Sequence, residues 1–85
     1  MYSVYVLKSL KDGKHYTGYT NDLKRRITEH NRGKTESTRR RRPFVLIYSE
    51  NFEEKDEAEK REKFFKSGRG REELKKIIHG AVPKW

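Results

Sequence analysis

The sequence predicts an α/β fold in which a small, three-stranded, mostly antiparallel sheet is flanked by helices, in the order β-β-α-β-α-α. Two segments rich in β-branched and aromatic residues surround an Asp-Gly pair, which is typical of a hairpin. A later apolar run has the length of a strand, and three segments have helical spacing. We expect one domain over residues 1–85.

The hairpin is expected to join a strand at residues 2–9 (YSVYVLKS) to a strand at residues 14–20 (KHYTGYT). A simple two-residue turn would place several residues on one face of the sheet, whereas a bulge in the connection would change this register. These residues are Tyr5, Leu7, Tyr16 and Gly18. The two tyrosines are therefore expected to point the same way.

The next segment predicts a helix that begins at Asp22, is capped by Thr20 or Asn21, and ends at Gly33. Its inward stripe has the spacing i, i+4, i+7, with Arg26 beside it, and consists of Leu23, Ile27 and His30. Residues 32–43 (RGKTESTRRRRP) lack apolar periodicity, which indicates a basic loop.

The third strand is expected at residues 44–50 (FVLIYSE), which follow Pro43. Because this run is almost continuously apolar, it would suit the middle of the sheet, where a strand is covered on both faces.

Two helices complete the predicted fold. Asp56 and Glu59 form an approximate capping box for a helix that ends at Ser67, since glycines follow at positions 68 and 70. A last helix over about residues 71–79 is expected to stop at Gly80. Its core residues are predicted to be Leu74, Ile77 and Ile78.

Positive charge is concentrated in the first half of the chain. The whole chain has 22 Lys and Arg against 13 Asp and Glu, a net charge of +9; twelve basic and four acidic residues fall within residues 1–43, a net of +8. This imbalance predicts that a polyanion binds the N-terminal half, with DNA favoured and RNA still open. A soluble protein with surplus lysine is the plainer alternative, and an anionic membrane surface is less favoured.

The composition also restricts the setting of the protein. The chain has no cysteine, which removes disulfides and thiolate metal sites. No apolar stretch approaches the ~18 residues of a membrane span, and the pattern of a secretory signal is missing. We expect a cytoplasmic protein without membrane contacts.

One carboxylate of the second helix falls on its apolar face. Ala58, Glu62 and Phe65 are spaced i, i+4, i+7, so Glu62 needs a cation nearby. That cation is either Arg26 or Lys66 in a structural ion pair, or a divalent metal at a functional site.

Four further side chains are candidates for chemistry. Arg26 and His30 lie four residues apart along one side of a helix, although an ordinary amphipathic helix explains both. Tyr5 and Tyr16 alone are more typical of sheet-face aromatics, because a phenol with a pKa near 10 is a poor base. Beside Arg26 and a metal, however, a phenolate would be favoured electrostatically.

The basic loop is interpreted as a phosphate clamp. Four consecutive arginines at positions 39–42, with Lys34, Thr35, Ser37 and Thr38 nearby, supply guanidinium forks and hydroxyls for phosphate oxygens. A solvated loop and an import-like signal remain alternatives. The residues expected to contact nucleic acid are Gly18, Lys34, Thr38, Arg39, Arg40, Arg41, Arg42 and Lys66.

Taken together, these residues resemble the GIY-YIG nuclease family, and in particular its short, stand-alone bacterial members. The two short strand motifs of the family correspond to Ser3-Val4-Tyr5 and Tyr16-Thr17-Gly18, with Ser3 in place of the first glycine. The segments YTGYTNDLKRRITEHNRGK and AEKREKFFKSGRG are also close to the short bacterial form. The resemblance extends over about residues 2–79.

The resemblance implies a role for each matching residue. Tyr5 and Tyr16 would line the site, with Tyr16 polarising the attacking water, and Gly18 would permit a close approach. Arg26 would neutralise charge on the scissile phosphate, and His30 would orient a tyrosine or relay a proton. Glu62 would hold one Mg²⁺ or Mn²⁺, since magnesium is bound by one or two carboxylates together with water and substrate phosphate.

The expected function is therefore metal-dependent endonuclease activity that hydrolyses phosphodiester bonds in DNA, in repair or recombination. Two alternatives keep the same fold. One is a non-catalytic module that only binds nucleic acid, and the other is an accessory subunit whose basic loop contacts a partner protein.

Overall fold

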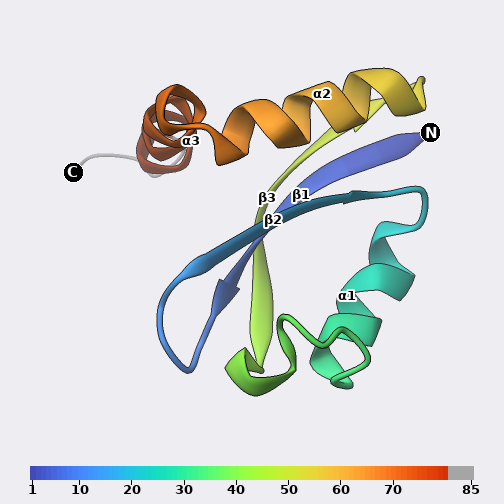
Figure 1. Cartoon of the computed structure of the whole chain (residues 1–85), viewed down its shortest axis with the longest axis vertical. Helices are drawn as coiled ribbons and strands as arrows, with labels where there is room; N and C mark the ends of the chain where they lie inside the picture. Colours follow the sequence, from blue (N-terminus) through green and yellow to red (C-terminus); the bar gives the residue numbers. More distant parts are fainter. Residues whose placement is uncertain (81–85) are drawn as a thin grey trace.

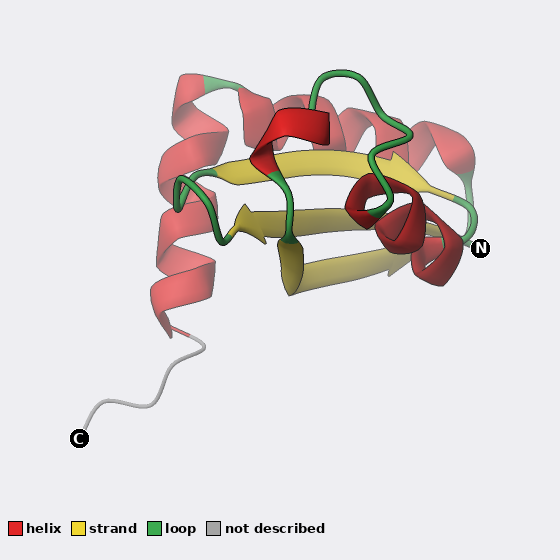
Figure 2. Cartoon of the chain, turned by 90° about the horizontal axis from the view of Figure 1, so that it is seen from below, coloured by secondary structure: helices red, strands yellow, loops and turns green. Residues whose placement is uncertain are grey.

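A computed structural model describes residues 1–80 and has a three-stranded sheet with helices on both faces (Figures 1 and 2). It confirms the expected α/β class and order of elements. The elements are β1 (Tyr2–Ser9), β2 (His15–Thr20), α1 (Leu23–Asn31), the 3-10 helix η1 (Arg39–Arg41), β3 (Phe44–Phe52), α2 (Lys55–Lys66) and α3 (Gly68–Gly80).

The strand order is β2-β1-β3, and both pairings are antiparallel. The expectation that the third strand is central is therefore wrong, because β1 lies in the middle. Four consecutive residues of β1 are buried, namely Val4, Tyr5, Val6 and Leu7. In β3, by contrast, Val45 and Leu46 are each 41% exposed, so its apolar run lies at an edge of the sheet.

The hairpin between β1 and β2 has a longer connection than expected. The Ser9 N–H donates to the Lys14 carbonyl at 2.9 Å, so the loop is residues 10–13, and Gly13 adopts a φ of +72°. Tyr5 pairs with Gly18 and Leu7 with Tyr16. This register differs by two residues from that of a two-residue turn, and a shift of two keeps every side chain on its predicted face.

Helix α1 is capped by Asp22 rather than by Thr20 or Asn21. The Asp22 carboxylate accepts from the Arg25 N–H at 3.1 Å, while the Thr20 hydroxyl accepts from the Asp22 N–H. At the other end, Gly33 has a φ of +79° and its N–H donates to the His30 carbonyl. The expected glycine stop is confirmed.

The junction between α2 and α3 lies earlier than the sequence indicated. The capping box of α2 pairs Glu54 with Glu57, not Asp56 with Glu59. Helix α3 already begins at Gly68 because the Ser67 hydroxyl accepts from the Gly70 N–H at 3.1 Å. A Cβ at Gly70 would overlap the Phe64 carbonyl oxygen, so glycine allows α3 to start directly against the end of α2.

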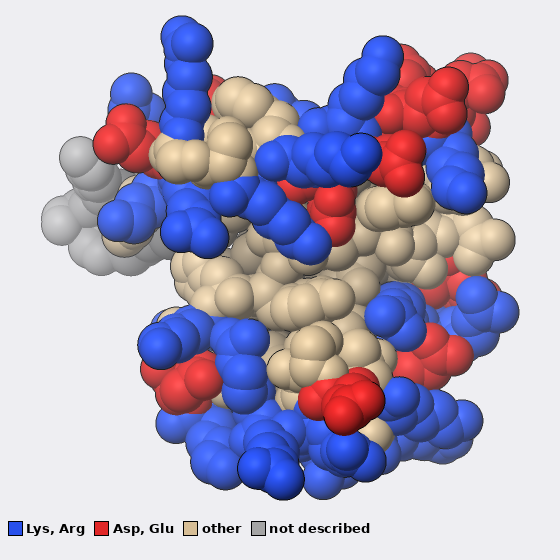
Figure 3. Space-filling view, viewed as in Figure 1, with Lys and Arg blue, Asp and Glu red and all other residues tan. Residues whose placement is uncertain are grey.

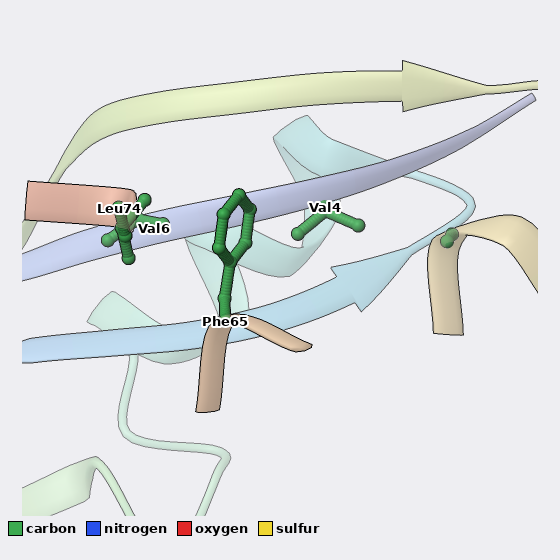
Figure 4. Packing of buried hydrophobic residues seen from close by; sticks show 5 residues of the cluster. Val4, Val6, Phe65 and Leu74 are labelled. Carbon is green, nitrogen blue, oxygen red and sulfur yellow. The ribbon is translucent and has the colours of Figure 1, made fainter. Parts of the chain in front are cut away.

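One face of the sheet forms an apolar core with α2 and α3. Val4 and Val6 of β1 pack with Ala58, Phe65 and Leu74, and Figure 4 shows the Phe65 ring between Val4 on one side and Val6 with Leu74 on the other. Ile77 and Ile78 pack against this cluster, as expected for α3. Burying a side chain of this size stabilises the fold by roughly 1.5–3 kcal/mol.

The opposite face is covered by α1 and the segment 32–43. Tyr5, Leu7 and Phe44 are buried there, with Tyr16, Leu23 and Ile27 packed against them. The basic segment is more ordered than a plain loop, since it contains η1 and the Ser9 hydroxyl donates to the Arg41 carbonyl at 2.6 Å. No helix within residues 1–80 is long and apolar enough to cross a membrane.

Candidate functional site

A hydrogen-bonded chain of buried side chains connects the sheet to the basic segment. The Tyr5 hydroxyl lies 3.0 Å from His30 Nε2, and His30 Nδ1 lies 2.8 Å from Thr38 Oγ1. Tyr5, His30 and Thr38 are all fully buried. Because the Thr38 hydroxyl donates to the Thr35 carbonyl at 3.4 Å, its oxygen is free to accept from Nδ1–H. His30 Nε2 then accepts from the Tyr5 hydroxyl.

The imidazole of His30 is neutral near pH 7. Burial, with a further contribution from the charge of Arg26, lowers the pKa of His30 to about 4. A neutral ring has one donor and one acceptor nitrogen, which matches its two partners here. His30 therefore orients Tyr5 and Thr38.

Tyr5 is a neutral phenol. Burial raises the pKa of Tyr5 to about 12, although hydrogen bonding and the positive charge of Arg26 act in the opposite direction. Arg26 thus favours the phenolate, as expected, but in the protein alone desolvation outweighs the guanidinium. Tyr5 acts as a hydrogen-bonding group.

Gly18 lets the Tyr5 phenol extend across β2. A Cβ on Gly18 would lie 2.5 Å from the Tyr5 hydroxyl oxygen and 2.7 Å from the ring carbon that carries it. Any larger residue would displace the phenol. The Tyr5 phenol therefore lies against Gly18 of β2, which is an edge strand.

Tyr16 connects the two sides of this edge. Its half-buried ring lies 4.9 Å from the His30 ring and 6.4 Å from the Tyr5 ring, centroid to centroid. On the other side, the Lys66 ammonium lies 5.9 Å from its centroid. Tyr16 thus belongs both to the aromatic cluster beside α1 and to the surface beside the end of α2.

Arg26 lies beside the tyrosines and has an acidic partner that the sequence reasoning missed. Its Nη1 donates to the Glu29 carboxylate at 3.1 Å, and its side chain remains 32% exposed. Hydrogen bonding with Tyr5 and Glu29 raises the pKa of Arg26 despite partial burial, which lowers it. The i, i+3 spacing of Arg26 and Glu29 was the signal that would have identified this pair.

Glu62 projects from the buried face of α2, as its spacing predicted. Its side chain is only 14% exposed and forms an ion pair with Lys66 at 2.6 Å. Of the two cations considered, Lys66 is therefore the partner in this structure. The negative charge of Glu62 also contributes to the raised pKa of Tyr5.

Few side chains near Glu62 could bind a metal ion. Within residues 1–80 no cluster of three His, Cys, Asp or Glu side chains is suited to hold an ion. Glu62 alone fits the mode in which Mg²⁺ keeps several waters and takes one carboxylate together with phosphate oxygens. The site thus fits a divalent cation that arrives with, or is completed by, a phosphate-containing ligand.

The cationic side chains differ in their availability. Arg39, Arg40 and Arg42 are exposed and, with Lys11, Asn31 and Pro43, line an open hollow of about 510 Å³. Lys34 is also exposed. Figure 3 shows Lys and Arg side chains gathered above and below an uncharged belt across the face that presents β2.

Two residues of the expected phosphate clamp make contacts within the protein instead. Thr38 is fully buried and bonded to His30, so its role here is to position the imidazole. Arg41 donates to the Asp12 carboxylate at 3.0 Å and lies over the Phe44 ring. The sequence did not distinguish these two residues from their exposed neighbours.

Comparison with known proteins yields a consistent match. The family model described as the GIY-YIG catalytic domain matches residues 1–76. A UPF0213 protein of Staphylococcus saprophyticus is 44% identical over 91% of this chain and 94% of its own length, and a UPF0213 protein of Streptococcus agalactiae is 52% identical over 74% and 72%. The solution NMR structure of a UPF0213 protein from Bacillus halodurans matches with a TM-score of 0.55 and 43% identity, covering 91% of this chain and 85% of that one.

Proposed function

Because this chain belongs to the GIY-YIG family of nuclease domains, we propose that it is a divalent-metal-dependent endonuclease that hydrolyses phosphodiester bonds in DNA. The observation that carries the proposal is a convergence at the β2 edge. Tyr5, Tyr16 and Arg26 approach from the α1 side, and Glu62 with Lys66 approaches from α2. One phosphate placed at this edge would meet all of them.

The two tyrosines have different parts in the proposed reaction. A pKa of about 12 for Tyr5 and about 4 for His30 makes it costly to ionise either group. This pair therefore holds neighbouring groups in position and does not exchange protons. Tyr16 is half-buried and reaches the open side of the cluster, where its hydroxyl can orient the attacking water. Arg26 supplies positive charge where negative charge develops on phosphorus.

The cation of the proposed site would be Mg²⁺ or Mn²⁺ held by Glu62. When bound, it supplies Lewis-acid stabilisation of the phosphate oxygens. Lys66, which neutralises Glu62 in this structure, then becomes available for a phosphate oxygen. The ion pair thus neutralises the Glu62 carboxylate before substrate binds.

Binding is proposed to depend on backbone phosphates. Lys34, Arg39, Arg40 and Arg42 are exposed cations without a base-reading helix among them, so they would position the chain without recognising sequence. Affinity should then fall steeply with salt. Contacts of this kind are equally open to RNA and to an acidic partner protein, and a role in DNA repair belongs to the same proposal.

The test is a cleavage assay on a panel of substrates. Purified protein is incubated with supercoiled, branched and single-stranded DNA and with RNA, with Mg²⁺, Mn²⁺ or EDTA. We expect metal-dependent cutting of at least one DNA substrate, and a loss of about 100-fold or more in Glu62→Gln, since the carboxylate holds the cation. Glu53→Gln, which removes the same charge from an exposed position, should cut normally.

Two outcomes would overturn the proposal. The absence of cutting on every substrate, with salt-sensitive binding unchanged by Glu62→Gln, would favour a binding module on the same fold. Cutting that survives Glu62→Gln would remove this carboxylate from the reaction.

A further inference from the structure

A pocket of about 420 Å³ opens between β2 and the two C-terminal helices, next to the candidate site. Its walls come from β2, the last turn of α2 and one face of α3. The lining residues are His15, Tyr16, Thr17, Phe65, Lys66, Arg71, Leu74, Lys75, Ile78 and His79. Its size falls within the range of small-molecule binding sites in proteins.

The pocket combines an apolar interior with a cationic rim. Phe65, Leu74 and Ile78 belong to the core beneath α3 and present carbon atoms to the cavity. Lys66, Arg71 and Lys75 supply three positive charges, and among residues 1–80 no carboxylate lines the pocket. A ligand that complements both parts has a weakly polar body attached to an anion.

The pocket and the candidate site share two residues. Tyr16 lines the pocket and also lies 4.9 Å from the His30 ring within the aromatic cluster. Lys66 lines the pocket and is the ion-pair partner of Glu62. A ligand whose anionic group binds Lys66 can therefore extend the rest of the molecule into the pocket.

We infer that this pocket receives one unpaired nucleobase, so that the substrate class is DNA with an unpaired nucleotide beside the cleaved bond. The inference rests on the proposed function and names the substrate of the same site. A nucleotide combines a flat, largely apolar base with a phosphate, which matches the pocket and its rim. A base inside a fully paired duplex cannot enter, because its faces are covered by its neighbours.

The walls also offer polar groups to the edge of a base. These groups are the side chains of His15, Thr17 and His79, which line the pocket. Partial burial, together with the charges of Lys8 and His79, lowers the pKa of His15, which favours the neutral ring. A neutral imidazole carries one donor and one acceptor, which suits several bases and implies little preference among them.

The direct test compares two DNA duplexes that each carry a one-nucleotide flap. In one, the unpaired nucleotide has its base, and in the other it is abasic. Binding is followed by fluorescence anisotropy in EDTA, so that cleavage plays no part. We expect the abasic flap to bind about tenfold more weakly, because a base on an aromatic and apolar surface contributes a factor of this order.

Charge reversals on α3 provide a matched pair of variants. Arg71→Glu with Lys75→Glu changes two rim cations, whereas Arg69→Glu with Lys76→Glu makes the same change at exposed positions that do not line the pocket. We expect the rim pair to remove the difference between normal and abasic flaps. The control pair should lower both affinities similarly and keep the difference.

The results separate this inference from the proposed function. Equal affinity of the wild-type protein for both flaps would overturn the pocket assignment, even if DNA is cut in the presence of Mn²⁺. A tenfold difference in EDTA would support the pocket, even if no substrate is cut. A rim pair that keeps the full difference would also contradict the assignment.

Discussion

The two faces of the sheet are built from the same strand but serve different ends. Along β1, Val4 and Val6 point to α2 and α3, where they meet Phe65 and Leu74 in an apolar core. The alternating Tyr5 points to α1, where a buried imidazole and hydroxyl lie within a second apolar cluster that includes Leu7 and Phe44. The comparison indicates that one face supplies stability and the other holds polar groups in fixed positions.

The difference extends to charge. The α1 face keeps its buried groups neutral, since burial raises the pKa of Tyr5 and lowers that of His30. The carboxylate of the candidate site comes instead from α2, at the β2 edge, where Lys66 neutralises it. The proposed reaction thus uses buried neutral groups and the Arg26 guanidinium from the α1 side, and the Glu62–Lys66 ion pair from α2.

The largest expected effect concerns the apolar face. Phe65→Ala removes a fully buried ring and should lower the free energy of unfolding by about 3–5 kcal/mol. Urea denaturation followed by circular dichroism measures the loss. Leu10→Ala, at a position that is 59% exposed, is the control and should change stability by less than about 0.5 kcal/mol. A decrease in the free energy of unfolding below about 1 kcal/mol for Phe65→Ala would contradict the role assigned to this face.

The next prediction concerns a variant that should lower activity and leave the stability of the fold unchanged. Arg26→Ala should lower single-turnover DNA cleavage by at least ~100-fold with the fold intact, because a charge-stabilising donor is lost. Arg25→Ala is a close control, since Arg25 is its exposed neighbour and also lies 4.0 Å from Glu29. Near-normal cleavage by Arg26→Ala would remove this guanidinium from the site.

The neutral imidazole predicts a pH dependence of stability. A pKa of about 4 in the folded protein lies below the value of about 6.5 in the unfolded chain. The unfolded state therefore binds the proton first, so this stability is present above pH 6.5 and is lost as the pH falls toward 4. Between pH 7 and pH 5 the contribution of His30 should fall by about 2 kcal/mol.

The measurement compares urea unfolding at the two pH values for wild type, His30→Gln and His79→Gln. The first variant should lose the pH-dependent part, and the second, at an exposed histidine, should keep it. An equal pH dependence in all three proteins would show that His30 is not held neutral by burial.

The smallest expected effect concerns the Glu62–Lys66 ion pair. Lys66→Gln should change the free energy of unfolding by less than about 1 kcal/mol, because half of the Lys66 side chain is exposed and such pairs contribute little. Lys63→Gln, another exposed lysine of α2, is the control for thermal unfolding. A loss above about 2 kcal/mol would mean that the Glu62–Lys66 pair is structural, which would remove the contrast between the faces.

Much of the fold follows from local patterns. The hairpin, the α1 stripe and the α3 core positions are set by residues close in sequence, and each was predictable. The strand order was not, since the apolar run of β3 resembles a central strand although β1 takes that place. Covering a strand on both faces depends on long-range packing, which periodicity does not encode.

The site was predictable in its residue types but not in its contacts. The spacing of Glu62 on α2 placed it on the inner face, yet the choice between Arg26 and Lys66 as its partner depends on how α2 lies against β2. Thr38 resembled a surface hydroxyl among arginines, and only the folding of segment 32–43 back onto His30 buries it.

The central claim is that groups from both faces act on one phosphate, and a double-variant cycle tests it most directly. Single-turnover DNA cleavage with Mn²⁺ is measured for wild type, Arg26→Ala, Glu62→Gln and the combination, which join an α1 residue with an α2 residue. If both groups serve one transition state, the double variant should be about as slow as the slower single variant. Losses that multiply, to about 10,000-fold for two losses of ~100-fold, would contradict the shared site.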